Sequence, residues 1–351
     1  NLILAAENLA DHLTRFYLFF MPDFARDCYA DKAWFESTAK RFKAQTGSAY
    51  RPMLQARADF LHLTGILAGK WPHSLAIQPG GSTRPIQIQE QIRLLTTLNS
   101  FRHFLQDTLF GCELETISAL TTAQQLYALV DNNPHSDFAH FLHLAQDLGL
   151  DKLGRACDNF LSYGAYASAD SILFRAGVWQ AEANAPDQVF DQALITEDIS
   201  HSWMNAQAGA KHPFHGSTVV NDDESGGYSW CKAPRLDTRV MEVGALARQQ
   251  VNGHPLIRDL VAQSGGNVQN RVVARLLELA LVLPQMQFWV EQIQKGEAYC
   301  EVQAIPDEAQ GAGLVEAARG SLGHWLCIRN GRILNYQIIA PTTWNFSPRD
   351  G

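Results

Sequence analysis

Apolar side chains recur at helical spacing along the first part of the chain. Over residues 1–24 they fall every three or four positions, and charged residues occupy the other side. This period predicts an amphipathic helix that ends near Pro22. The same spacing continues over residues 31–68 and 86–110, with shorter helical pieces as far as about residue 151. The first part of the chain is therefore predicted to be helical.

The pattern changes in the second half of the chain. About residues 205–227 are polar and rich in glycine, which predicts a surface excursion. Two strong helices are predicted near residues 237–262 and 268–295. The segment 312–345 indicates small β elements joined by turns, with Asn330-Gly331 as a hairpin turn. Together these patterns predict a mainly α fold with minor β structure.

Composition narrows the class of protein. The chain has 351 residues, of which 46% are hydrophobic and 18% charged, as in a globular protein with a sizeable core. Its formal net charge of −8 argues against a nucleic-acid partner, because phosphate binding needs a basic surface. The longest apolar stretch, residues 276–290, includes Glu278 and Pro284 and is too short to span a bilayer.

Cysteine and histidine spacing gives no metal signature. The histidines show no H-E-x-x-H pattern, and the cysteines form no C-x-x-C pair. Isolated thiols in so long a chain favour free cysteines in a reducing compartment. We therefore expect a cytoplasmic protein, or one at the cytoplasmic face of the membrane. The six cysteines are Cys28, Cys112, Cys157, Cys231, Cys300 and Cys327.

Four segments, taken in order, closely resemble the large subunit of nickel–iron hydrogenases. Any one of them is a weak signal, but their order and spacing together make the resemblance specific, and it covers essentially the whole chain. They are Asp11–Tyr17 with Asp23 after it, Tyr228–Arg235 followed by Val243–Arg248, Glu316–Trp325, and Ala340–Asn345 followed by Pro348–Asp350. The resemblance implies a hydrogenase large-subunit-like helical bundle with small β elements, as a single domain over residues 1–351.

The resemblance also implies a site. In this family the last of these segments borders an iron that carries one carbon monoxide and two cyanides. Thr342 matches the hydroxyl donor to one cyanide, and Arg319 would bond the other and hold its guanidinium over the metals. Asp23 would orient Arg319 through a charge-assisted pair. Pro341 and Ala318, beside these residues, are assigned to the same cofactor-binding pocket.

Other residues in the segments receive more ordinary interpretations. Without the resemblance, Arg319 and Asp23 would be an ordinary salt bridge and Thr342 a plain turn residue. Lys232 and His324 are expected to have supporting structural roles. Core packing is the expected role of three tryptophans, Trp230, Trp325 and Trp344.

The sequence also departs from the family. The family's nickel is held by four cysteines in two C-x-x-C pairs, and this sequence contains neither pair. No nickel ligand is therefore assigned here, and the chain is expected to be an internal fragment that is inactive alone. Ala318 and Ala245 stand where many members have proline, and Arg15 stands where histidine is usual.

These departures favour the branch that contains hydrogen-sensing regulatory and cyanobacterial-type uptake enzymes. Phe19 or Phe20 could narrow gas access to the site, or both could be core residues. The full-length protein is expected to split H2 heterolytically, with a nickel thiolate or Arg319 as the base. Two alternatives are a purely signalling H2 sensor that reports to a kinase, and a metal-free relative of the quinone-reactive subunit of complex I.

Cofactors and partners follow from the same resemblance. The full-length protein would carry the nickel–iron centre with its cyanide and carbon monoxide ligands, and a magnesium ion at the C-terminal histidine that is typical of the family. Electrons would leave through a small subunit with iron–sulfur clusters to an electron acceptor.

Overall fold

The structure is a computed structural model in which the chain forms two compact units. Unit 1 comprises residues 1–154 and 255–303, and unit 2 comprises residues 155–254 and 304–351. The described residues are 1–351 without 169–170, 183–186, 206–208, 222, 224–225 and 295. Each unit is assembled from two separate stretches of the chain, so the expected single domain over residues 1–351 stays a prediction.

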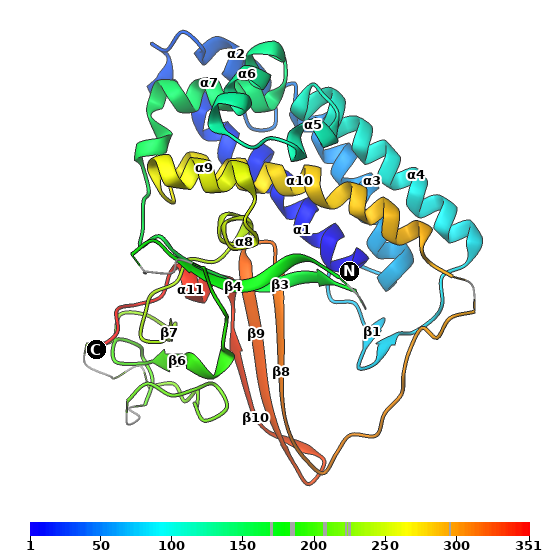
Figure 1. The fold of residues 1–351 in the computed structure, drawn as a ribbon, viewed down its shortest axis with the longest axis vertical. Coiled ribbons are helices and arrows are strands. Elements are labelled where there is room, and N and C mark those ends of the chain that lie inside the picture. The colour runs from blue at the N-terminus through cyan, green and yellow to red at the C-terminus, as the bar shows by residue number, and fades with distance from the viewer. Residues whose placement is uncertain (169–170, 183–186, 206–208, 222, 224–225, 295) are drawn as a thin grey trace. The chain divides into compact units, whose positions relative to one another are not determined.

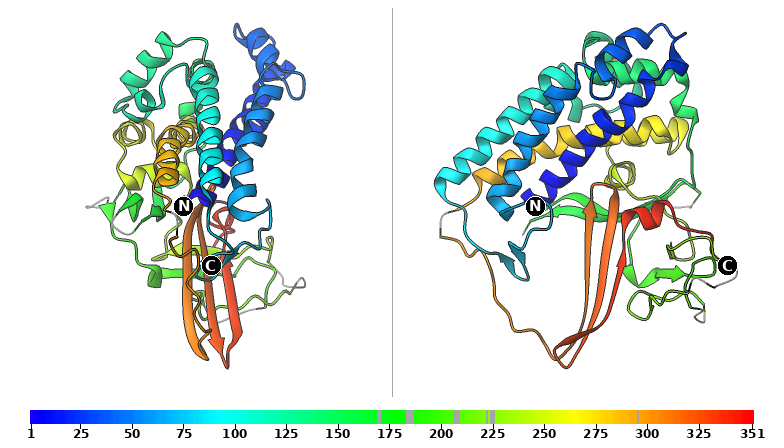
Figure 2. Two further views of the ribbon diagram at one scale, coloured as in Figure 1. Left: turned by 90° about the vertical axis from the view of Figure 1, so that its right-hand side faces the viewer. Right: turned by 180° about the vertical axis from the view of Figure 1, so that it is seen from behind.

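Unit 1 is helical, as the apolar spacing predicts (Figures 1 and 2). Helix α1 packs against α3 and α10, and α10 also contacts α4 and α5. A short β1–β2 ladder, Ile77–Gln78 with Gly81–Ser82, interrupts the helices. The α-helices are α1 (Leu2–Thr14), α2 (Phe35–Phe42), α3 (Tyr50–Ala68), α4 (Ile88–Phe104), α5 (Leu114–Ser118), α6 (Ala123–Asn132), α7 (Asp137–Leu148), α9 (Pro255–Ser264) and α10 (Val268–Glu291).

The first helix does not keep one geometry to its end. It continues from α1 into a π-helical turn, Arg15–Phe20, and then a 3₁₀ turn, Met21–Ala25. Pro22 lies at the start of that last turn, close to where the sequence predicts the end of the helix. Phe19 is 63% exposed, so the interpretation of both phenylalanines as core residues is wrong for Phe19. Phe20 instead packs edge-on against Phe24 and Phe141.

Helix α10 is the central apolar element of unit 1. Among the described residues it alone is long and apolar enough to cross a membrane. Its most apolar stretch is 61% buried inside the protein, as is usual for the core helix of a globular unit. Its carboxylate Glu278 is buried and lies 2.8 Å from Nε2 of the buried His12 on α1. The apolar surface of α10 is therefore explained by packing within unit 1.

The described residues of unit 2 form small antiparallel sheets, two short α-helices and one 3₁₀ turn, Gln192–Leu194. Strands β3 (Asn159–Ala167) and β4 (Ile172–Gln180) form a hairpin, which β5 (Asp187–Gln188) extends. Helix α8 (Ala245–Asn252) packs on β3 and β4. A second ladder joins β6 (Ile195–Asp198) to β7 (Ala233–Leu236), and three longer strands, described next, complete the unit.

The three-stranded sheet has the order β8–β9–β10, with β9 in the centre. Its strands are β8 (Glu308–Ala317), β9 (Gly320–Arg329) and β10 (Arg332–Ile339). Asn330 and Gly331 join β9 to β10 with φ values of 52° and 66°, as a two-residue hairpin turn requires. The predicted hairpin is therefore confirmed, and the mainly α fold with minor β structure is also confirmed.

Two predicted elements are corrected. The helix expected over 237–262 is two helices, α8 and α9, because Gly253 has φ 83° and Pro255 follows His254. The end of the chain also contains a short helix, α11 (Pro341–Asn345), where the sequence suggested only a loop. Proline suits the first position of a helix, since its missing N–H is not needed there.

The polar segment at about 205–227 lies between β6 and β7, and residues 206–208, 222 and 224–225 are outside the described part. Its described portion forms isolated bridges rather than strands, such as Met204 with Val220. Val219 and Val220 are exposed, which agrees with a surface position.

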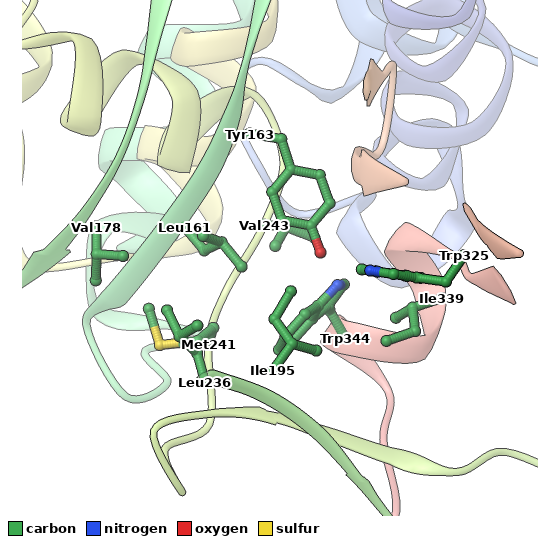
Figure 3. Packing of buried hydrophobic residues seen from close by; sticks show 10 residues of the cluster. All are labelled: Leu161, Tyr163, Val178, Ile195, Leu236, Met241, Val243, Trp325, Ile339 and Trp344. Carbon is green, nitrogen blue, oxygen red and sulfur yellow. The ribbon is translucent and has the colours of Figure 1, made fainter. Parts of the chain in front are cut away.

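The core of unit 2 gathers side chains from several strands and from α11 (Figure 3). Trp325 of β9 and Trp344 of α11 are 1% and 2% exposed, which confirms their predicted packing role. Trp230 is 55% exposed and stacks at an angle on Trp203, so its predicted core position is wrong. The members are Leu161, Tyr163, Val178, Ile195, Leu236, Met241, Val243, Trp325, Ile339 and Trp344.

Candidate functional site

One end of the β8–β9–β10 sheet carries the residues expected to bind the cofactor. Ala317 pairs with Gly320, so Ala318 and Arg319 form the tip of the β8–β9 hairpin. At the same end Ile339 of β10 pairs with Gly323 of β9, and the chain then enters α11. The strand register therefore brings the hairpin tip and α11 to one edge (Figures 1 and 2). We call this end of the sheet the hairpin-tip site. It consists of Ala318, Arg319, Pro341 and Thr342.

The two side chains that are predicted to bind the cofactor are accessible. Arg319 and Thr342 are exposed, Ala318 is half-buried, and Pro341 is buried. Exposure suits groups that would donate hydrogen bonds to a ligand rather than to the protein core. Pro341 instead anchors the start of α11 in the unit.

Close backbone packing fixes the hairpin tip against the start of α8. A Cβ atom on Gly320, whose φ is 130°, would lie 2.5 Å from Cγ2 of Val243 and 2.6 Å from the nitrogen of Gly244. A Cβ on Gly244, whose φ is 129°, would lie 3.2 Å from the carbonyl oxygen of Arg319. Glycine is needed at both positions, because a side chain would be strained and would push these segments apart.

A buried ion pair between Arg248 and Glu316 lies next to the hairpin tip and fixes its backbone. Nη1 of Arg248, on α8, lies 3.0 Å from Oε2 of Glu316 and donates to the carbonyl of Ala317 at 2.8 Å. Its Nη2 donates to the carbonyl of Ala318 at 3.3 Å. One guanidinium therefore binds the last residues before Arg319. This fork geometry is available to arginine and not to lysine.

Glu316 accepts further hydrogen bonds on the other side of its carboxylate. The backbone N–H of Tyr163 donates to Oε1 at 2.8 Å, and the hydroxyl of Ser321 donates to the same oxygen at 2.5 Å. Burial raises the pKa of the Glu316 carboxyl, and Arg248 and these donors oppose that rise. The carboxylate thus joins β3, β8, β9 and α8 at one point beneath the tip.

Asn345 ties α11 to the same segment. Its Oδ1 accepts from the backbone N–H of Val243 at 3.0 Å, and its Nδ2 donates to the carbonyl of Val243 at 3.0 Å. This paired contact resembles one rung of a β-ladder. Val243 directly precedes Gly244, so both halves of the hairpin-tip site are fastened to the entry of α8.

The Tyr228–Arg235 segment has a structural role in the same unit. Arg235 donates to Oδ2 of Asp350 at 2.8 Å, to Ser347 at 3.0 Å and to the carbonyl of Pro348 at 3.1 Å. Arg235 lowers the pKa of the Asp350 carboxyl. The charged residues near the end of the chain therefore fold back on β7.

Lys232 of the same segment is buried beside two partners. Its Nζ donates to Gln337 at 2.9 Å and lies 3.4 Å from Oε2 of Glu197. Burial raises the pKa of the Glu197 carboxyl, which Lys232 opposes. His324 lies 2.7 Å from the hydroxyl of Tyr336 on the neighbouring strand. Both contacts agree with the structural roles expected for Lys232 and His324.

Asp23 belongs to unit 1, whereas Arg319 belongs to unit 2. Asp23 lies in the 3₁₀ turn that follows the π-helical turn, and it is exposed. The pair between Asp23 and Arg319 stays a prediction.

The donors at the hairpin-tip site fit one part of the implied cofactor. A hydroxyl and a guanidinium on the same edge are suited to cyanide nitrogens, which only accept hydrogen bonds. They are not suited to hold a metal. Within the described part of the chain, no group of three or more His, Cys, Asp or Glu residues could do so. The fit therefore concerns recognition of the iron's ligands, not ligation of nickel.

Three residues of the four segments have roles that the sequence alone does not predict. The hairpin-tip site is held in place by Arg248, Glu316 and Asn345. The sequence pattern assigned no role to any of them. For Arg248 and Glu316 the available signal was a charged residue among apolar neighbours, because a buried charge requires a partner. The identity of that partner depends on the fold.

Comparisons with known proteins agree with this architecture. The sequence profile of the family described as "Nickel-dependent hydrogenase" matches residues 43–351. The periplasmic [NiFeSe] hydrogenase large subunit of Desulfomicrobium baculatum is 26% identical over 385 residues, covering 100% of this chain and 69% of that protein. The uptake hydrogenase large subunit of Rhodobacter capsulatus is 36% identical over 203 residues, covering 46% of this chain and 34% of that protein.

Solved structures show the same fold. The Ni-Fe-Se hydrogenase of D. vulgaris Hildenborough superposes with a TM-score of 0.79 and 25% identity, covering 100% of this chain and 72% of that chain. The [NiFeSe]-hydrogenase of Dm. baculatum superposes with a TM-score of 0.81 at 24% identity, covering 100% and 73%. These relatives are periplasmic and uptake enzymes, and they give no support to the predicted placement in the sensing branch. The profile match over most of the chain shows that it belongs to the nickel-dependent hydrogenase family.

Proposed function

We propose that this chain is part of the large subunit of a nickel–iron hydrogenase that oxidises H2 in an uptake role. The observation that carries the proposal is the convergence of Arg319 and Thr342 at one edge of the β8–β9–β10 sheet. The uptake role is supported by the similarity of this chain to the uptake hydrogenase large subunit of Rhodobacter capsulatus. A sensing role lacks comparable support.

The residues of the hairpin-tip site would act by positioning. Thr342 would donate its hydroxyl hydrogen bond to one cyanide, and Arg319 would donate to the other, with Ala318 and Pro341 beside them. The nickel–iron centre, when bound, supplies the Lewis-acid metals for heterolytic H2 cleavage. Arg319 would also offer a charged N–H group near the reacting gas, where a proton must be handled. Asp23 would orient the Arg319 guanidinium through a charge-assisted pair.

Partners and location are further parts of the proposal. A large subunit passes electrons to a partner, so we propose a small subunit with iron–sulfur clusters. The cysteines of this chain are free, which fits the proposed cytoplasmic location or the cytoplasmic face of the membrane.

The test is Arg319→Lys in the full-length protein that contains this chain, purified with its small subunit. Lysine keeps the charge but loses the planar fork, so the rate of H2 oxidation should fall by about tenfold to a hundredfold. Nickel and iron content, measured on the same sample, should stay unchanged. Near-normal H2 oxidation with full metal content would remove Arg319 from the mechanism.

A matched control separates the site from general surface charge. Arg329 lies at the far end of β9, and Arg329→Lys changes the same residue type on the same strand without touching the hairpin-tip site. Its H2 oxidation should equal that of the unsubstituted protein. Slow turnover in the unsubstituted protein itself, together with reversible binding of a kinase, would favour sensing over uptake.

A further inference from the structure

Three buried polar atoms in the core of unit 2 face one another. Tyr163, Trp325 and Trp344 are 7%, 1% and 2% exposed. Figure 3 shows the phenol oxygen and both indole nitrogens turned toward the same space. Within the described part of the chain, the Trp344 N–H approaches the Tyr163 phenol closely enough to lower its pKa, but none of the three atoms makes a hydrogen bond of ordinary geometry. The three side chains come from β3, β9 and α11, so the space lies where these elements meet.

Buried polar groups of this kind need a hydrogen-bond partner. More than nine-tenths of buried polar groups have a hydrogen-bond partner, and each group without one costs about 1–3 kcal/mol. Both indole nitrogens are donors only, so they cannot bond to each other. The phenol can accept as well as donate, but it is a single oxygen facing two donors. The group that satisfies the set must therefore offer acceptor lone pairs.

Charge decides which acceptor fits. Two donor-only N–H groups exclude a cation as their ligand. An anion is also disfavoured, because the carboxylates of Glu316 and Glu197 lie near enough to act on Tyr163. Burial raises the pKa of the Tyr163 phenol, and those two carboxylates raise it further, while the facing Trp344 N–H opposes them. A neutral molecule is the remaining class.

We propose that a single buried water molecule binds between Tyr163, Trp325 and Trp344. Its lone pairs accept the two indole N–H groups, and one of its protons is donated to the phenol oxygen. Three polar partners are the usual number for a buried water. The Tyr163 ring is held in place by Phe190, whose centroid lies 5.0 Å away, so the phenol oxygen is a fixed partner.

The water would link α11 to the two strands beneath it. Trp344 is two positions after Thr342 on α11, so a bond to its indole fixes that helix from inside the unit. This water and the Asn345 contact with Val243 would then hold α11 at two points. The water site does not depend on the proposed function, and only its consequence for Thr342 does.

The direct test is a crystal structure of the full-length protein, at a resolution that shows ordered water. We expect one water peak within hydrogen-bond distance, about 2.7–3.2 Å, of both indole nitrogens and the phenol oxygen. Direct N–H to phenol bonds with no peak between them would overturn the proposal. Density for a larger group would overturn it as well.

A solution measurement tests the same contacts in variants. Tyr163→Phe removes one partner of the water but keeps the ring, so the indole N–H resonances of Trp325 and Trp344 should shift and exchange faster with solvent. The melting temperature should fall by about 2–4 °C. Tyr166→Phe, another buried tyrosine of β3 outside this cluster, is the matched control and should leave both resonances unchanged. Unchanged resonances in Tyr163→Phe would contradict the proposal.

Discussion

Arg248 and Glu316 form an ion pair inside unit 2, with 3.0 Å between Nη1 and Oε2 and side chains that are 1% and 0% exposed. A buried pair of this kind is weak evidence of net stabilisation, because two charges must leave water. The pair instead positions the β8–β9 hairpin tip, since the same guanidinium also donates to the carbonyls of Ala317 and Ala318.

Removing one member of this pair should be costly. Arg248→Gln leaves the Glu316 carboxylate buried without its cation, so the free energy of unfolding should fall by about 3–5 kcal/mol. Urea unfolding measures this. The double variant Arg248→Met with Glu316→Gln should recover part of the loss, because no buried charge remains.

A surface pair provides the comparison for that result. Lys32 and Asp147 lie 2.9 Å apart with side chains that are 33% and 45% exposed. Lys32→Gln should lower the free energy of unfolding far less than Arg248→Gln does, because water screens an exposed ion pair. Equal losses in Arg248→Gln and Lys32→Gln would contradict the role assigned to the buried pair.

The Asn345 contact should be measurable at one backbone amide. Asn345→Ala removes both bonds to Val243, so the free energy of unfolding should fall by about 1–3 kcal/mol. Hydrogen exchange at the Val243 amide should become faster in the same variant. Asn345→Asp keeps an acceptor for that amide and should slow the exchange again. No difference between the alanine and aspartate variants would show that the amide is protected by other contacts.

Thr342 is predicted to matter for the cofactor and not for folding. Because its side chain is exposed, Thr342→Val should change the free energy of unfolding by less than about 0.5 kcal/mol. In the metal-loaded full-length protein, the same change should shift a cyanide stretching band in the infrared spectrum. Thr342→Ser keeps the hydroxyl and should preserve the band. Identical spectra for the unsubstituted protein, Thr342→Val and Thr342→Ser would contradict the prediction that Thr342 donates to a cyanide.

Acid should weaken unit 1 through His140. Burial lowers the pKa of this histidine from its ordinary value of 6.5, and His143 and Arg41 lower it further, while Asp137 opposes them. Its Nε2 lies 2.6 Å from Oγ1 of Thr38. Below about pH 6.5 the unfolded chain then binds more protons than the folded one, so stability falls as pH decreases toward the lowered pKa.

The variant His140→Gln isolates this effect, since glutamine can still form hydrogen bonds but does not titrate. Between about pH 7.5 and pH 5.5 it should lose less stability than the unsubstituted protein. Urea unfolding at both pH values gives the two differences. Parallel losses in the two proteins would assign the pH dependence to other groups.

The helices and the Asn330-Gly331 turn could be predicted from the sequence because each depends on a local pattern. The cofactor-binding role of the hairpin-tip site rests on a resemblance between short segments and stays a prediction. The break at Gly253 was missed because a long apolar period outweighed one glycine and one proline. Trp230 was placed in the core by residue type alone, although its exposure depends on which strand covers it. The partners of Arg248 and Asn345 are 68 and 102 positions away in the sequence, and only tertiary packing brings them together.

The division of each unit between two stretches of chain has a consequence for synthesis on the ribosome. Residues 1–154 emerge before α9 and α10, which complete their core and follow only after a hundred residues of unit 2. Unit 2 in turn waits for its three-stranded sheet until the last part of this sequence is made. Nascent chains must therefore expose apolar helix surfaces for many seconds at ordinary elongation rates of about 5–20 residues per second. Such chains are natural clients for chaperones that shield hydrophobic surface until the later segments arrive.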